Sequence, residues 1–467
     1  MNDVKTSTCS GGCPGLLAPL LTEFVGTFFL CLTITLSADS ALGPLAIGAM
    51  LMSMTFMGGQ ISGAHYNPAI TFAVALTGKL SWMKASYYAA TQVAASFIAG
   101  IVGGVIAKGE GLTPGYPSVA PGRHISAIIC EFLFTFILAK VVLNVAGHSQ
   151  RPNNSFYGLA IGLTVFSGIV SVGDISGGAF NPAVGTGLPV MQGSFLDVTV
   201  FWIGPMLGAF TAALFFWATN GDEFALESYV PKPSAAIRGL SPYIMEAVGT
   251  FFLTFVISMS SNSLLGPLSI GAILVAVVFM SGHISGGHFN PAVTAAVYST
   301  GAIEFRKGCF YIVSQFVGSL LAAGVARFLM GWRMGYPTIA GGAASIPAAL
   351  LLEMLGTFAL VLTVFHTSVG PSKKELQFGE DDGENSFYGL AIGMVVFALI
   401  TLAGGVSGGA FNPAVGTTLP FLAGDFMDFW LYWIAPVIGA LAAAGVFTIT
   451  HGNKDAFSEI PGATTNA

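Results

Sequence analysis

The sequence predicts an all-α, polytopic membrane protein made of two tandem units, each with six transmembrane helices and two short re-entrant half-helices. Of its 467 residues, 54% are hydrophobic and 8% are charged, whereas a soluble domain carries about 25% charged residues. A helical span needs about 20 apolar residues, which leaves room for about twelve spans. This composition excludes soluble and disordered proteins, and nucleic-acid binders, which need a basic surface.

The N-terminal segment 1–15 is expected to form a cytoplasmic tail. The apolar run 16–36 contains Glu23 and is long enough to span the membrane, so we predict a transmembrane helix rather than a cleavable signal peptide. Cys9 and Cys13 bracket a Ser-Gly-Gly sequence in the tail. A loose tail is favoured over a metal site, which would lack two ligands, and over palmitoylation. No disulfide framework, metal or cofactor is expected.

The chain contains a duplication. Glu23-Phe-Val-Gly-Thr-Phe-Phe-Leu returns with one substitution from Glu246. Ser176-Gly-Gly-Ala-Phe-Asn-Pro-Ala-Val-Gly-Thr returns unchanged from Ser407. The second pair lies further apart than the first because the second copy carries an acidic loop, 371–385. A solvated surface insertion is favoured for this loop over a gating or cation-binding role.

Each copy also repeats within itself, because Glu131-Phe-Leu-Phe-Thr and Glu353-Met-Leu-Gly-Thr echo the first of these sequences and its copy. Each quarter has three spans, an odd number, so the two quarters of a copy are inverted repeats. Each copy has six spans, so both copies have the same orientation. We predict a first unit at 16–219, a linker at 220–239, a second unit at 240–450 and a C-terminal tail at 451–467.

The placement of basic residues predicts cytoplasmic termini. On this topology eleven of the 16 Lys and Arg residues lie on the side of the termini: Lys5, Lys79, Lys84, Arg151, Lys232, Arg238, Arg306, Lys307, Lys373, Lys374 and Lys454. Lys140 lies inside an apolar helix, has no counterpart in the second copy and is expected to snorkel towards the membrane surface. A plasma membrane and a vacuolar membrane stay equally open as locations.

Each quarter carries one Asn-Pro-Ala motif after a glycine-rich bend. Asn is a preferred N-cap and Pro is tolerated at the first helical position, so each motif is expected to begin a short re-entrant helix. Two inverted half-helices then meet near the midplane, where their dipoles repel cations. The alternative is that these motifs do no more than begin helices, and four occurrences at matched positions disfavour it. The motif residues are Asn67, Pro68, Ala69, Asn181, Pro182, Ala183, Asn290, Pro291, Ala292, Asn412, Pro413 and Ala414.

These residues resemble the aquaporin (major intrinsic protein) superfamily, with two complete channel units in one chain. The resemblance rests on Glu-x-x-Gly-Thr, on Ser-Gly-Ala-His-x-Asn-Pro-Ala and on the second Asn-Pro-Ala of each unit. It implies passive conduction of small neutral solutes, no enzyme activity, and four units around an axis. Four units here are two chains, so we expect a homodimer that forms a four-pore pseudo-tetramer in the lipid bilayer.

The resemblance also assigns roles to residues. Buried glutamates in the family support the re-entrant loops, a role favoured over a proton relay for Glu23, Glu131, Glu246 and Glu353. Alignment by spacing gives the pore constriction four residues per unit. In the first unit these are Ile47, Ile169, Gly178 and Val184, and in the second Ile270, Ile400, Gly409 and Val415.

Many family members have Arg where this chain has Val184 and Val415. The loss of a guanidinium removes several donors and a charge, so the sequence predicts a wide, dry and uncharged gate. Val here resembles tonoplast-type plant aquaporins, which are associated with water, urea, ammonia and peroxide, although those usually keep a His where Ile169 and Ile400 stand. Glycerol facilitators are disfavoured because they keep an Arg-Asp pair.

We therefore expect a channel for water and small uncharged solutes. A plain water channel is the alternative within this class. From other classes, a twelve-helix secondary transporter and a non-conducting structural membrane protein stay as alternatives. The transporter is disfavoured because the motifs build a complete pore in each half.

Overall fold

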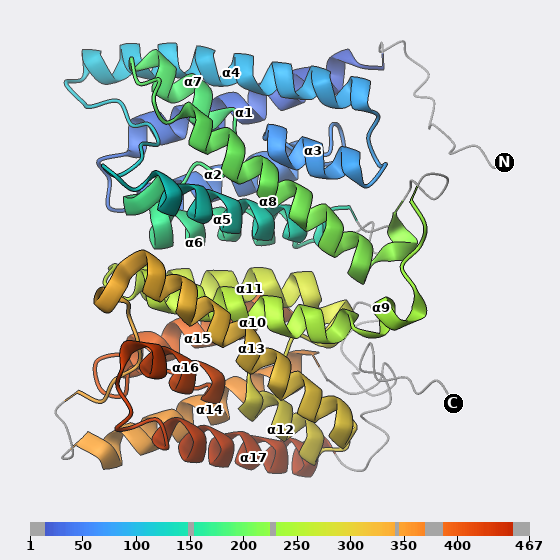
Figure 1. The fold of residues 1–467 in the computed structure, drawn as a ribbon, viewed down its shortest axis with the longest axis vertical. Helices are drawn as coiled ribbons and strands as arrows, with labels where there is room; N and C mark the ends of the chain where they lie inside the picture. The colour runs from blue at the N-terminus through green and yellow to red at the C-terminus, as the bar shows by residue number, and fades with distance from the viewer. Residues whose placement is uncertain (1–14, 148–153, 225–229, 341–344, 369–385, 452–467) are drawn as a thin grey trace.

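The computed structural model describes residues 15–147, 154–224, 230–340, 345–368 and 386–451. The expectations for Cys9, Cys13, the acidic loop 371–385 and nearly all of both tails concern residues outside these ranges. The predicted all-α membrane fold is confirmed. The two units lie one above the other along the long axis of the molecule, with their helices roughly parallel (Figure 1).

Within the described ranges, the first unit has six long helices and two short ones. The long helices are α1 (Leu17–Ser37), α2 (Gly43–Gly58), α4 (Trp82–Gly109), α5 (His124–Val145), α6 (Tyr157–Ser176) and α8 (Val198–Thr219). The short helices are α3 (Pro68–Leu76) and α7 (Val184–Met191). A 3₁₀ turn, η1 (Gly221–Glu223), and the short helix α9 (Ala235–Gly239) lead to the second unit.

The second unit repeats this order. Its long helices are α10 (Ser241–Ser260), α11 (Gly266–Ser285), α13 (Phe305–Met330), α14 (Ile346–Ser368), α15 (Tyr388–Ala403) and α17 (Leu431–His451), and a 3₁₀ turn, η2 (Gly331–Arg333), follows α13. Its short helices are α12 (Pro291–Ser299) and α16 (Pro413–Ala423).

Ten of the long helices are long and apolar enough to cross a membrane. The other two, α2 and α15, have 16 residues each, about 24 Å at 1.5 Å per residue. Each of them crosses another helix closely at a pair of glycines. A Cβ atom on Gly48 would lie 2.8 Å from the carbonyl oxygen of Gly162, and one on Gly271 would lie 2.7 Å from that of Gly393. These glycines let α2 cross α6 and α11 cross α15 almost backbone to backbone.

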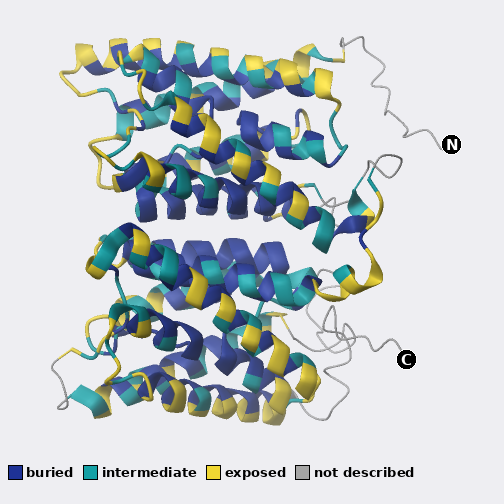
Figure 2. Cartoon of the chain, viewed as in Figure 1, coloured by how far each residue is buried: buried dark blue, intermediate teal, exposed yellow. Residues whose placement is uncertain are grey.

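The units meet through α5 and α6 on one side and α10 and α11 on the other, and these four helices form the most buried layer (Figure 2). Phe156 and Phe279 stack with ring centroids 4.1 Å apart. The hydroxyls of Ser167 and Ser269 lie 3.1 Å apart. The seam therefore combines aromatic packing with buried polar contacts.

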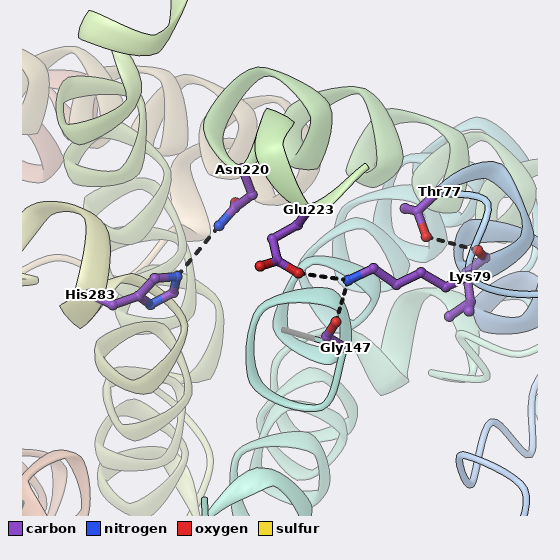
Figure 3. Close-up of polar contacts among 7 residues, drawn as sticks. Thr77, Lys79, Gly147, Asn220, Glu223 and His283 are labelled. Carbon is purple, nitrogen blue, oxygen red and sulfur yellow. Dashed lines mark hydrogen bonds and ion pairs between the residues drawn. The ribbon is translucent and has the colours of Figure 1, made fainter. Parts of the chain in front are cut away.

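Lys79 is anchored between the end of α5 and the turn η1 that follows α8. Lys79, after α3, contacts the carbonyl oxygen of Gly147 and lies 3.4 Å from Glu223 (Figure 3). Burial lowers the pKa of the Lys79 ammonium, and the charge of Glu223 opposes that shift. Lys79 thus ties the loop after the first half-helix to the linker between the units.

The expectation that Lys140 snorkels was wrong, because its side chain is fully buried. Its Nζ donates to the hydroxyl of Thr219 at 2.6 Å and to Asn220 Oδ1 at 3.4 Å. The amide of Asn220 in turn lies 3.5 Å from Nε2 of His283 in the second unit (Figure 3). The carboxyl end of a helix carries partial negative charge, so α8 offers the ammonium a site inside the protein.

Candidate functional site: the asparagine loops and their cavities

In the first unit, the two half-helices meet through an exchange of hydrogen bonds. Asn67 Nδ2 donates to the carbonyl oxygen of Phe180 at 2.8 Å, and Asn181 Nδ2 donates to that of Tyr66 at 2.9 Å. Each Oδ1 atom accepts from the backbone two residues ahead, at Ala69 and Ala183. Each asparagine thus caps its own half-helix and holds the loop of the other.

The second unit repeats this exchange. Asn290 Nδ2 donates to Phe411 at 2.8 Å, and Asn412 Nδ2 donates to Phe289 at 2.9 Å. Three half-helices begin at the proline of their motif, whereas α7 begins at Val184, two residues after Pro182. The Asn181 carbonyl still accepts from Gly185 at 2.9 Å, so the first turn of α7 is hydrogen-bonded as in the others.

The residue before each asparagine is an aromatic in the left-handed region. The φ angles are 50° at Tyr66, 49° at Phe180, 50° at Phe289 and 48° at Phe411. Such a conformation costs about 1–3 kcal/mol for a non-glycine residue and persists only where the surroundings impose it. The same strained conformation occurs in all four asparagine loops, so these loops are candidates for the functional site.

A buried glutamate accepts hydrogen bonds from each strained loop. Glu23 accepts from the backbone of Tyr66 at 2.7 Å and of His65 at 3.0 Å, and from the Ser62 hydroxyl at 2.6 Å. Glu131 accepts from Phe180 at 2.6 Å. Glu246 and Glu353 do the same for Phe289 and Phe411 at 2.7 and 2.6 Å, and all four carboxylates are fully buried.

The glycine of the Glu-x-x-Gly-Thr motif makes room for the strained aromatic ring. A Cβ atom on Gly26 would lie 2.1 Å from the Tyr66 ring, and Gly249 and Gly356 stand in the same relation to Phe289 and Phe411. In the remaining quarter Phe134 replaces this glycine, and its ring packs 5.2 Å from that of Phe180. There the room comes from Gly168, where a Cβ would lie 2.6 Å from the Phe180 ring.

Each asparagine pair borders a narrow cavity with largely apolar walls. In the first unit all four residues of the expected constriction line it: Ile47, Ile169, Gly178 and Val184. In the second unit Ile400 and Gly409 line the corresponding cavity, while Ile270 and Val415 are buried without bordering it. Elsewhere the two linings agree at nearly every repeated position, for example Leu30 with Leu253 and Ile34 with Ile257.

Four polar residues that support the loops from behind were not predicted from the sequence. Gln92 Nε2 donates to Glu23 at 2.8 Å, and the Tyr88 hydroxyl donates to the Ser62 carbonyl at 2.9 Å. Gln315 and Tyr311 repeat both contacts in the second unit. A usable signal was present, since these polar residues interrupt apolar helices and recur at corresponding positions of the two copies.

Comparison with known proteins decides the family. Residues 20–216 and 236–447 each match the family model for Major intrinsic protein. The chain belongs to the major intrinsic protein family. This is a family of channels, not of enzymes, and the two matches confirm the tandem arrangement of two family domains. The resemblance drawn from the sequence motifs is thereby also confirmed.

Individual relatives match about half of this major intrinsic protein. The probable aquaporin TIP2-2 of Arabidopsis thaliana is 32% identical over 50% of this chain and 95% of its own length. Nodulin-26 of Glycine max is 33% identical over 47% of this chain and 81% of its own. Among solved structures, the aquaglyceroporin from Plasmodium falciparum is 19% identical over 44% of this chain and 95% of that one, with a TM-score of 0.36.

Proposed function

We propose that the chain is a passive channel for water and small uncharged solutes, among them urea, ammonia or hydrogen peroxide, with two separate pores. The observation that carries the proposal is the asparagine exchange at each cavity. A side-chain amide nitrogen carries two hydrogens. Each Nδ2 donates one of them to the facing loop, so the second can be donated to a passing solute. The half-helix N-termini add positive potential that opposes cations and protons.

The constriction residues set the proposed selectivity. With Val184 and Val415 where many relatives have Arg, the gate lacks a fixed charge and a set of donors. Gly178 and Gly409 add width. Such a gate admits weakly hydrated neutral molecules larger than water. The plant relatives, aquaporins among them, agree with a channel for water and small solutes.

Loop support is the role we propose for the four buried glutamates. Each carboxylate accepts three hydrogen bonds from its loop, two from the backbone and one from a serine hydroxyl, as Glu353 does from Ala410, Phe411 and Ser407. A carboxylate occupied in this way holds the strained aromatic residue in place. A proton relay would require one of these bonds to break in every cycle.

Two chains in one assembly are favoured by the internal repeat. Phe156 and Phe279, stacked at the seam, correspond by their offsets to Phe387 and Phe56. Phe387 is 63% exposed and Phe56 is 40% exposed, although their counterparts are buried. The faces of α1 and α2 and of α14 and α15 thus repeat the surfaces already buried at the seam. A second copy that meets them the same way closes a ring of four pores.

The boundaries and orientation follow the same proposal. The units extend over 16–219 and 240–450, joined by a linker at 220–239, and both termini lie in the cytoplasm. The motif residues Asn67, Asn181, Asn290 and Asn412 then lie near the midplane of the bilayer. The lysine-rich side that holds Lys79 faces the cytoplasm.

Stopped-flow light scattering of proteoliposomes tests the function, with an impermeant osmolyte and then with urea. We expect the wild type to pass both water and urea, and Val184→Arg/Val415→Arg to keep water but lose urea. Passage of water alone would make the chain a plain water channel. Permeability no higher than that of empty vesicles would favour a non-conducting protein, and saturable, gradient-coupled uptake would favour a transporter.

A further inference from the structure

The polar chain behind each first half-helix ends at a histidine that borders the pore. Gln92 Nε2, held by Glu23, also donates to the hydroxyl oxygen of Thr71 at 3.0 Å. Thr71 Oγ1 lies 3.2 Å from Nδ1 of His65. The His65 ring packs edge-on against Tyr88, with centroids 5.4 Å apart, and lines the cavity together with Asn67.

The second unit holds its histidine in the same way. Gln315 Nε2 donates to Thr294 at 2.9 Å, and Thr294 Oγ1 lies 3.1 Å from Nδ1 of His288. Tyr311 packs against the ring at 5.2 Å. In both units Nδ1 is occupied, and among the hydrogen bonds of the described residues none involves Nε2. Nε2 is therefore the ring nitrogen left for a molecule in the pore.

Few other polar side chains border the cavities. The constriction side chains are aliphatic or absent, and the Tyr66 hydroxyl is used by the Met54 carbonyl at 2.8 Å. At the position of His65 the inverted repeat has Ala179, which lines the same cavity. The histidine therefore gives one side of each asparagine pair a polar side chain where the other side has an alanine.

We propose that His65 and His288 coordinate the solute on the side of the asparagine pair away from the apolar constriction, and that Thr71 with Gln92, and Thr294 with Gln315, position them. The ligand class is a small neutral molecule with both donor and acceptor groups, such as urea or hydrogen peroxide. A neutral imidazole presents a donor or an acceptor at Nε2 according to its tautomer. The Thr71 hydroxyl can donate to Nδ1 or accept from it, so it serves either tautomer of His65. In the second unit Thr294 Oγ1 donates to the Asn290 carbonyl at 3.1 Å, so it accepts from Nδ1–H and leaves Nε2 of His288 as an acceptor. This inference rests on the proposed channel function.

The test compares urea and water permeability in proteoliposomes. Thr71→Val/Thr294→Val removes both hydroxyls and keeps the side-chain shape, and Thr71→Ser/Thr294→Ser restores them. We expect the valine pair to change the urea-to-water ratio by about threefold or more, as for the loss of one net hydrogen bond, and the serine pair to restore it. Thr211→Val, at a half-buried threonine of α8 whose hydroxyl donates to the Leu207 carbonyl at 2.9 Å, serves as the matched control.

The same substitutions in a His65→Ala/His288→Ala background separate positioning from general damage. Without the imidazole, the valine pair should cause no further change in the ratio. An unchanged ratio in the wild-type background, or the same change with and without histidine, would overturn the inference. If the valine pair does not fold, Thr71→Cys/Thr294→Cys is used instead, because a thiol of similar size forms a weaker hydrogen bond. We expect it also to change the urea-to-water ratio, and this change too should vanish without the histidines. A wild type that does not conduct would instead refute the channel function itself.

Discussion

The side-chain amide of Asn67 donates to the carbonyl oxygen of Phe180 at 2.8 Å, across 113 residues of sequence. Phe180 directly precedes Asn181, whose amide returns the bond to Tyr66, the residue before Asn67. Each loop is thus held by the cap of the other half-helix. A disturbance of one loop reaches the facing asparagine through a single hydrogen bond, so both halves of a pore should fail together.

The two proposed pores predict separable permeabilities. Val184→Trp should fill the first constriction and leave about half of the water permeability, because the two pore linings are nearly the same and distant sites act additively. Ile400→Trp, at a residue that lines the second cavity, should do the same, and the double variant should approach empty vesicles. Stopped-flow rates normalised to protein content measure this. A single variant that abolished all permeability would point to one shared path.

Glu131→Gln should disrupt the second loop of the first unit. The carboxylate accepts from Phe180 at 2.6 Å, Ala179 at 3.0 Å and the Ser176 hydroxyl at 2.8 Å. The amide of Gln places donors against donors, and each buried unsatisfied group costs about 1–3 kcal/mol. We expect a lower thermal midpoint in detergent and loss of the first pore, measured with the second closed by Ile400→Trp. Asp174→Asn, at an exposed position in α6, should change neither quantity.

Gly26→Ala should displace the ring of Tyr66. The added methyl group would lie 2.1 Å from that ring, and overpacking of this kind costs about 1–3 kcal/mol. The thermal midpoint should fall, and conduction by the first pore should fall with it. Gly324→Ala is the control, since a Cβ there meets nothing within 4 Å and alanine favours a helix interior. Equal effects of the two substitutions would mean that helix propensity alone decides the result.

Repeats and motifs made most of the fold predictable, because an Asn-Pro-Ala motif has one local meaning, a capped helix start, and four copies reveal the symmetry. The site of Lys140 was not predictable, and the recurrence of Gln92 as Gln315 marks a role without telling which loop it serves. A buried lysine depends on where the carboxyl end of α8 lies, and a glutamine behind a loop depends on which helices pack together. The strain at Tyr66 and Phe180 is likewise a product of tertiary contacts with Glu23 and Glu131.

The Lys79 ammonium predicts a pH-dependent term in stability. Burial lowers its pKa in the folded state, so between that pKa and the unfolded value the unfolded chain holds more protons. The free energy of unfolding should then rise with pH through this alkaline window. Removing Glu223 takes away the charge that opposes the shift, so Glu223→Gln should extend the window to lower pH. Lys79→Met should abolish the term, and a slope that survives Lys79→Met would assign it to another group. Thermal midpoints at stepped pH measure it.

Two-chain assembly predicts a specific cross-link. If the seam repeats between chains, Phe56 of one chain stacks on Phe387 of the other, as Phe279 stacks on Phe156 within a chain. Phe56→Cys and Phe387→Cys, in a background with Cys9, Cys13 and Cys309 changed to Ser, should give an oxidant-dependent dimer on denaturing gels. Phe56→Cys paired with Phe310→Cys, an exposed position on α13, should give none. Neither α13 nor α4, the helix that corresponds to it in the first unit, lies at the seam between the units. Native mass spectrometry of the uncross-linked protein should show two chains. Cross-links of equal yield in both pairs, or a single chain in lipid, would remove the four-pore ring and leave a two-pore monomer.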